Sequence, residues 1–207
     1  VWQDNASRKI VGYDLYVGDP QTDNIILAFR RAVIAQGVPE SVYVDNGKDY
    51  DSFALHGRTK KQRRARRGQG ERPFIYGIFA SMGVKAHNVQ KYHGQSKLSE
   101  RYFGTMEGQF CRMFPDAYCG NRPDTRPEGV QKRLDAGKAP TLQELADAFG
   151  KWVEDVYNAG EHTGDGMDGK SPNQVFAEKL ATKRTAPHDL LDVLLLKHSK
   201  PVEVTQN

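Results

Sequence analysis

The sequence is short of cysteine, of long apolar runs and of any apolar leader. Its two cysteines, Cys111 and Cys119, lie eight positions apart with no CxxC pair and no histidine at zinc spacing. This excludes a disulfide framework and predicts reduced thiols. No stretch approaches the roughly 18 apolar residues of a membrane span. Residues 1–4 have neither a basic region nor an apolar core, so we expect no signal peptide and a cytoplasmic location. They also lack an initiator methionine, so we expect the chain to be cut from a longer protein.

The composition is that of a globular protein. Of the 207 residues, 38% are hydrophobic and 27% are charged, which excludes a disordered or collagen-like chain. A chain of this length buries around 70% of the surface that it exposes when unfolded, so it needs neither a disulfide nor a structural metal to fold.

Positive charge is concentrated in one segment. Residues 57–73 hold eight lysines and arginines against one glutamate, a net charge of +7 in a protein whose total is +4. Seven of these cations fall within ten residues: Arg58, Lys60, Lys61, Arg63, Arg64, Arg66 and Arg67. We therefore expect a basic loop over residues 52–72 that binds a polyanion, most simply nucleic acid. The alternative is a solvated run of charge.

Apolar periodicity in the first half alternates between strand and helix. The expected elements are a hairpin over 1–17, a helix that starts at Asp19-Pro20 and ends at Gly37, a strand over 41–45, a short helix over 74–82, a strand over 84–89 and a long helix from about 96. On the long helix, one stripe is formed by Leu98, Tyr102, Met106, Phe110 and Met113.

The second half is typical of helices. Residues 115–140 are rich in proline, glycine and charge and are interpreted as an extended connection. Capping boxes at Thr141 and Ser171 each predict the start of a helix. We expect a mixed α/β core over 1–114 followed by a helical extension over 141–207.

Asp45 is the first candidate for chemistry. It ends the apolar strand expected over 41–45 and runs into Asn46-Gly47. Functional groups of α/β proteins gather where strands end. Taken alone, the residues also suit a simple Asp-Asn-Gly turn.

Glu100 is its candidate partner. It lies off the apolar stripe of the long helix, with Gly104 and Gly108 one and two turns further on the same face. Each glycine costs about 1 kcal/mol relative to alanine in a helix, and close approach of a ligand or backbone would explain that cost. The alternative is a surface charge network with Lys97 and Arg101.

Taken together, these motifs resemble the DDE transposase and integrase superfamily, and in particular the Mu-type phage transposase catalytic core. The likeness is carried by residues 44–47 (Val-Asp-Asn-Gly), by residues 93–104 (His-Gly-Gln-Ser-Lys-Leu-Ser-Glu-Arg-Tyr-Phe-Gly) and by the 55 positions between Asp45 and Glu100. Residues 1–12 resemble the family's second and third strands. Its tail is matched by Trp152, Tyr157, Asn158, His162 and residues 169–176.

The resemblance implies an RNase H-like fold, a mixed sheet flanked by helices, and phosphoryl transfer on DNA. The parent protein would nick the 3′ end of a mobile element and join it to target DNA, as a multimer assembled on DNA. Asp45 would be the second acid of a metal-binding triad and Glu100 the third. Two Mg²⁺ or Mn²⁺ ions suit such chemistry and prefer oxygen ligands. By the same resemblance, Lys97 and Arg101 would contact phosphates; the alternative is ordinary helix solvation.

One departure from the family concerns the first acid. In the family it lies on a strand about 20 residues before the segment that matches the start of this chain, so it is missing here and the chain alone should be inactive. Asp4 and Asp14 are the candidate stand-ins, the first next to a hairpin turn and the second in mid-strand on a solvated face. Two rivals remain, a nuclease that does not join strands and a catalytically silent DNA-binding or assembly module.

The histidines are less promising as ligands. His87 and His93 are interpreted as ordinary polar residues, and His162 as a structural residue that closes the C-terminal helices.

Overall fold

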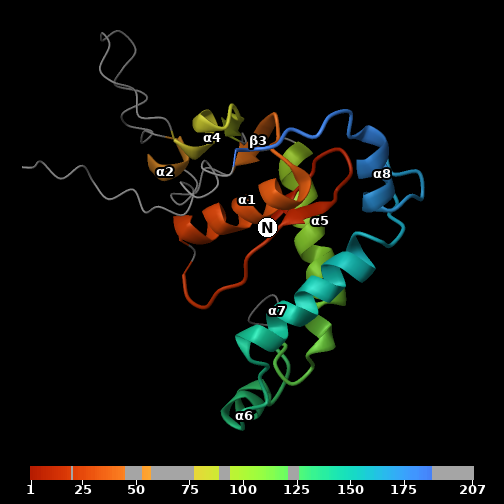
Figure 1. The fold of residues 1–207 in the computed structure, drawn as a ribbon. Coiled ribbons are helices and arrows are strands. Elements are labelled where there is room, and N and C mark those ends of the chain that lie inside the picture. Colours follow the sequence, from red (N-terminus) through yellow and green to blue (C-terminus); the bar gives the residue numbers. More distant parts are fainter. Residues whose placement is uncertain (20, 45–52, 57–76, 89–93, 121–125, 188–207) are drawn as a thin grey trace, which may run out of the picture.

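The computed structural model describes residues 1–19, 21–44, 53–56, 77–88, 94–120 and 126–187. These residues form a mixed α/β half and a helical half (Figure 1). The basic segment 57–73, Asp45, His93 and the apolar run 190–196 lie outside the described residues.

Within the described ranges, four short strands form two separate sheets. The antiparallel sheet pairs β1 (Trp2–Gln3) with β2 (Ile10–Gly12), which confirms the predicted hairpin. The parallel sheet pairs β3 (Ser41–Val44) with β4 (Lys85–Asn88), register Ser41 to Lys85, which confirms both predicted strands.

Helices make up most of the remaining regular structure. They are α1 (Thr22–Gln36), α2 (Phe53–His56), α4 (Ile78–Ser81), α5 (Gly94–Gln109), α6 (Val130–Asp135), α7 (Leu142–Lys151) and α8 (Pro172–Lys179). A 3₁₀ turn over Cys111–Met113 follows α5, and a π-helical segment over Trp152–Tyr157 continues α7. Both predicted capping boxes are present, at Thr141 and Ser171.

Two apolar clusters hold these elements together. The first joins the α1 stripe of Ile26, Phe29 and Val33 to the buried face of β3 and to α4. The second joins Ile10 of β2 to α5, α7 and the π-helical segment, with Trp152 among its members. Because α5 runs from the α/β half toward α7 and α6, it belongs to both halves (Figure 1).

The sequence-based boundaries need several corrections. Helix α1 begins at Thr22 with Gln21 as an extended N-cap, later than the Asp19-Pro20 signal, because the apolar stripe fixes the helix face but not its first residue. Helix α5 begins at Gly94, two residues before the expected start.

The stripe on α5 is also shorter than predicted. Tyr102 and Phe110 are buried, but Met113 is 58% exposed. Met113 lies in the 3₁₀ turn, where about three residues per turn replace 3.6 and rotate the following side chains off the stripe.

Residues 115–140 are not wholly extended. Helix α6 follows Gly129, whose φ of 69° is left-handed. With only two apolar side chains, at Val130 and Leu134, this short helix has almost no periodic signal in the sequence.

Candidate functional site

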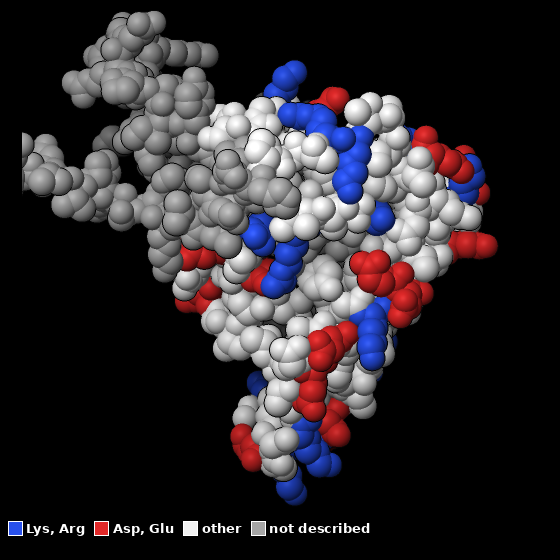
Figure 2. Space-filling view, in the orientation of Figure 1, with Lys and Arg blue, Asp and Glu red and all other residues white. Residues whose placement is uncertain are grey.

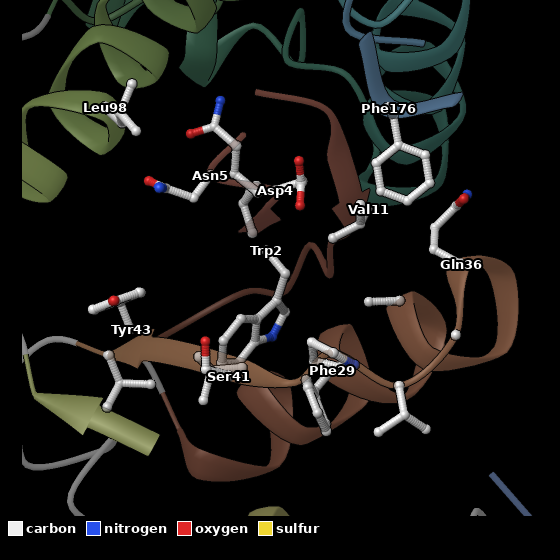
Figure 3. Close-up of a pocket in the computed structure, with 18 of the residues that line it drawn as sticks. Trp2, Asp4, Asn5, Val11, Phe29, Gln36, Ser41, Tyr43, Leu98 and Phe176 are labelled. Carbon is white, nitrogen blue, oxygen red and sulfur yellow. The ribbon is translucent and has the colours of Figure 1, made fainter. Parts of the chain in front are cut away.

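A cavity of about 780 Å³ lies between the two sheets, beneath the first half of α5. Its walls include Trp2 of β1, Ser41 and Tyr43 of β3, and Leu98 of α5, which approach it from different sides in Figure 3. It exists because β1 pairs with β2 and β3 with β4, and no described strand joins the two pairs.

Aromatic packing fixes the hairpin wall of this cavity. The Trp2 indole donates to the Ile25 carbonyl at 3.3 Å, and its ring lies 5.2 Å from the ring of Phe29 and 6.2 Å from that of Phe79. On the opposite wall, Tyr43 stacks on His87 at 5.1 Å between ring centroids. His87 is therefore held against an exposed tyrosine, in keeping with an ordinary polar role.

Glu100 lies on the α5 wall of the cavity with an exposed side chain. It forms no ion pair with any side chain that the structure describes, so the alternative of a surface network with Arg101 gains no support there. Arg101 is exposed one position along, and the side chain of Lys97 lies outside the described residues.

The end of β3 borders the same cavity. Val44, the residue before Asp45, lines the wall together with Glu100. The end of β3, directly before Asp45, and the helix that carries Glu100 therefore meet at one cavity, and Asp45 itself lies outside the described residues.

Both proposed stand-ins for the first acid have partners within the chain, and Asp4 also lines the cavity. The Asp4 carboxylate accepts from the Ser7 backbone N–H at 2.8 Å and from its hydroxyl at 2.6 Å, which closes the hairpin turn as its sequence suggested. Asp14 is not in mid-strand, because β2 ends at Gly12. It pairs with Arg31 at 2.9 Å and its side chain is only 10% exposed, so the predicted solvated face is wrong.

The donor chemistry of the cavity fits a hard divalent ion only in part. Glu100 offers carboxylate oxygens of the type that Mg²⁺ and Mn²⁺ prefer. Across the described ranges, no three histidine, cysteine, aspartate or glutamate side chains gather as metal ligands would.

Gly104 and Gly108 leave open space along α5. A Cβ placed on either glycine would have no neighbour within 4 Å among the described atoms. Packing against the described residues therefore does not explain these two glycines, and approach of a ligand remains the prediction.

The residues of the tail motif connect the helical half to the β1–β2 hairpin by hydrogen bonds. The buried Asn158 amide accepts from the Ile10 N–H at 2.9 Å and donates to the Ile10 carbonyl at 3.0 Å, as a neighbouring strand would. The Tyr157 hydroxyl accepts from the Gln3 amide at 2.9 Å. His162 Nε2 lies 2.9 Å from the Tyr157 carbonyl, and burial lowers the pKa of its ring.

Charge on the described surface is mixed. On the face shown in Figure 2, basic and acidic side chains are interspersed over the described residues. The concentrated positive charge of this chain is therefore that of the segment 57–73. Within the described ranges, no helix is long and apolar enough to cross a bilayer.

Comparison with known proteins places this α/β domain among the DDE-type transposases. The sequence profile of the bacteriophage Mu transposase family matches residues 1–180, so the chain belongs to that family and the predicted resemblance is confirmed. No curated protein sequence matches the chain.

Among solved structures, the chain is similar to a chain of the simian T-cell lymphotropic virus intasome, determined by cryo-electron microscopy in complex with the PP2A regulatory subunit B56 gamma. The two share 16% identity with a TM-score of 0.44. The similarity covers 93% of this chain and 49% of that chain, so this chain spans about half the length of the viral one.

Proposed function

We propose that this chain is the larger part of the RNase H-like catalytic core of a DNA transposase, which nicks the 3′ end of an element and joins it to target DNA. The observation that carries the proposal is that Glu100 and the end of β3, directly before Asp45, border one cavity. Membership of the Mu transposase family supplies the reaction class. DNA, both element ends and target, is the proposed partner, and assembly on DNA as a multimer belongs to the same proposal.

The two acids have a chemical role that suits their residue type. Asp45 and Glu100 would hold Mg²⁺ or Mn²⁺ through carboxylate oxygens. Two such ions, when bound, supply activation of an attacking oxygen and stabilisation of a leaving oxygen at phosphorus. Arg101 and Lys97, on the same helix, would orient the DNA backbone beside them.

The proposal includes a further acid that lies on a strand before Val1. Ser7 binds one carboxylate oxygen of Asp4 and Arg31 pairs with Asp14, so both carboxylates already have a role within the chain. Two acids alone leave a divalent pair with few ligands and excess charge, so the 207-residue chain should show little or no nicking of element-end DNA with Mn²⁺.

The test is neutralisation of each acid in the full-length parent. Asp45→Asn and Glu100→Gln should abolish nicking while leaving DNA affinity and thermal stability nearly unchanged, because Glu100 is exposed and lacks a described ion-pair partner. Glu128→Gln, also outside the buried core but away from the cavity, is the matched control. A Glu100→Gln protein that nicks at the normal rate would refute the assignment.

A strand-transfer assay separates the transposase from a nuclease of the same fold. Pre-nicked element ends incubated with supercoiled target should give joined products on a gel. Hydrolysis without joining would favour the nuclease, and DNA binding without either reaction in the full-length parent would favour an assembly module.

We further propose that the basic segment 57–73 binds the DNA backbone without reading sequence. Each phosphate neutralised adds about −0.9 to the slope of log K against log salt, so four engaged cations should contribute roughly −3.6. Replacing Arg63, Arg64, Arg66 and Arg67 by alanine should flatten that slope and weaken binding to unrelated sequences equally. An unchanged slope would mean that the segment does not contact phosphates and is only a solvated insertion.

A further inference from the structure

Glu100 and the end of β3 are held by different apolar clusters. The buried residues of β3 pack in the first cluster, with α1 and α4, whereas α5 packs in the second cluster through Tyr102. Glu100 and Val44 line the walls of one cavity. The position of Glu100 relative to that strand end therefore depends on the contacts that tie α5 to the rest of the α/β half.

Tyr102 is the anchor of α5 beside Glu100. It lies two residues after Glu100, is 3% exposed, and is the single buried side chain among those that the structure describes on α5. Its ring meets the ring of Tyr157 edge-on, with 5.4 Å between the ring centroids. Because an edge-to-face aromatic pair prefers a particular geometry, this contact orients α5 as well as burying it.

Tyr157 also holds the other side of this joint. Its hydroxyl accepts a hydrogen bond from the side-chain amide of Gln3 in β1 at 2.9 Å, and Gln3 lines the cavity. The next residue, Asn158, bonds to both backbone groups of Ile10 in β2. These two neighbours thus fix α5 against the hairpin, and the hairpin packs in turn on α1.

The π-helical segment is what places Tyr157 at the joint. The buried side of α7 runs through Phe149 and Val153, and an uninterrupted α-helix would continue it at Val156. Val156 is instead 50% exposed, and Tyr157 and Asn158 are buried. The wider turn, closed by the Asn158 N–H on the Val153 carbonyl at 2.8 Å, shifts the buried side by one residue. Such segments are rare and recur at functional sites.

We propose that Tyr157 is a positioning residue for Glu100, which it holds at the cavity through Tyr102. The inference rests on the proposed function, in which Glu100 is a metal ligand. The Glu100 side chain is exposed and has no ion-pair partner among the described residues, so the helix that carries it sets its position. Replacing groups that orient a metal ligand typically lowers metal affinity about 10- to 100-fold.

The test compares Tyr157→Leu, Tyr157→Phe and Phe149→Leu in the full-length parent. Tyr157→Leu should raise the Mn²⁺ concentration needed for half-maximal nicking at least about tenfold. Tyr157→Phe keeps the ring against Tyr102 and should behave like the natural sequence. Phe149→Leu is the matched control, because it removes a buried ring of the same cluster whose described ring contacts do not include Tyr102. It should lower stability without changing the Mn²⁺ requirement.

Amide hydrogen exchange, measured without metal or DNA, gives a readout that does not depend on activity. Tyr157→Leu should speed exchange of the amides of residues 98–104 at least about tenfold relative to those of α1, which packs in the other cluster. Phe149→Leu should leave this ratio nearly unchanged, because Phe149 contacts Phe110, beyond the far end of α5. A merely structural role for Tyr157 would move α5 and α1 together.

The outcomes separate this inference from the proposed function. A Tyr157→Leu protein with the natural Mn²⁺ requirement or an unchanged exchange ratio would overturn the proposal and leave the transposase assignment intact. If Tyr157→Leu does not fold, Tyr157→Met replaces it under the same two criteria, since the flexible methionine fills the space without a ring. A natural sequence that does not nick DNA would refute the proposed function instead, and the exchange ratio would still decide whether Tyr157 fixes α5.

Discussion

At the scale of single residues, the Asn158 side chain makes the two hydrogen bonds with Ile10 that the backbone of a neighbouring strand would make. Its amide satisfies both backbone groups of Ile10 in a fully buried position. Buried polar groups that lose their partners each cost about 1–3 kcal/mol. This residue therefore connects the helical half to the hairpin by hydrogen bonds rather than by apolar packing alone.

Asn158→Ala should lower the free energy of unfolding by about 2–4 kcal/mol, because both Ile10 groups lose their partner. Urea unfolding followed by circular dichroism measures it. Gln143→Ala, which removes an exposed bond to Asp147, is the control and should change stability by less than about 0.5 kcal/mol. A loss no larger than that of the control would show that the amide pairing is not needed.

His162 should make stability depend on pH. Burial lowers its pKa, outweighing the hydrogen bond to the Tyr157 carbonyl, which acts in the opposite direction. The folded state therefore favours the neutral ring, and its contribution is complete above the unfolded pKa of about 6.5 and lost as pH falls through the lower folded value.

Urea midpoints at about pH 7.5 and 5.5 measure this contribution. The decrease toward acid should be smaller in His162→Gln than in the natural sequence, because the variant has no ring to protonate at this position. An identical pH dependence in both proteins would contradict the assignment.

At the scale of elements, two glycines have opposite structural roles: Gly12 lies in β2 and Gly104 in α5. A Cβ on Gly12 would lie 2.4 Å from the Ala28 carbonyl oxygen and 2.7 Å from the Ala32 Cβ, so Gly12 sets how closely β2 approaches α1. Gly104 on α5 has open space instead.

Gly12→Ala should destabilise the protein by about 1–3 kcal/mol or more, because helix backbone blocks the added methyl group. Gly104→Ala should stabilise it by up to about 1 kcal/mol through helix propensity. Thermal unfolding of both variants measures whether stability falls or rises.

If DNA approaches this face of α5, Gly104→Ala in the full-length parent should also nick DNA more slowly despite its greater stability. Normal nicking would remove the functional reason for that glycine.

The elements with a clear period or cap were predictable, as was the local β1–β2 hairpin, but the pairing of β3 with the distant β4 was not. The stripe of α1, both capping boxes and the alternation in β3 depend on neighbours within a few residues. The second arm of the hairpin expected over 1–17 stops at Gly12, opposite Trp2, and Asp14 beyond it pairs with Arg31. Likewise, family resemblance singled out Asp45 and Glu100 as candidate acids. The cavity between β3 and α5 could not be predicted from the sequence, because it depends on contacts between distant segments.

At the scale of the whole molecule, the segment after α8 returns to the α/β half and fastens the two halves together. The Arg184 carbonyl accepts from the Val38 N–H at 2.8 Å. The Arg184 guanidinium donates to the carbonyls of Pro39 at 3.0 Å and Met82 at 3.1 Å. Met82 is the C-cap of α4, so the guanidinium supplies a partner for a carbonyl at the end of that helix.

Arg184→Ala should therefore release this segment before the protein unfolds globally. Two charge-assisted hydrogen bonds disappear, and we expect a loss of about 1–3 kcal/mol in the unfolding free energy. Lys183→Ala, which removes one exposed bond to the Ala35 carbonyl, is the neighbouring control and should lose less than about 1 kcal/mol. Limited digestion with subtilisin under native conditions should cut residues 180–187 faster in Arg184→Ala than in the control, because opening of the segment governs cleavage when opening and closing are fast. Equal cleavage rates in the two variants would mean that the backbone bond at Val38 and the packing of Ala186 hold the segment without the guanidinium.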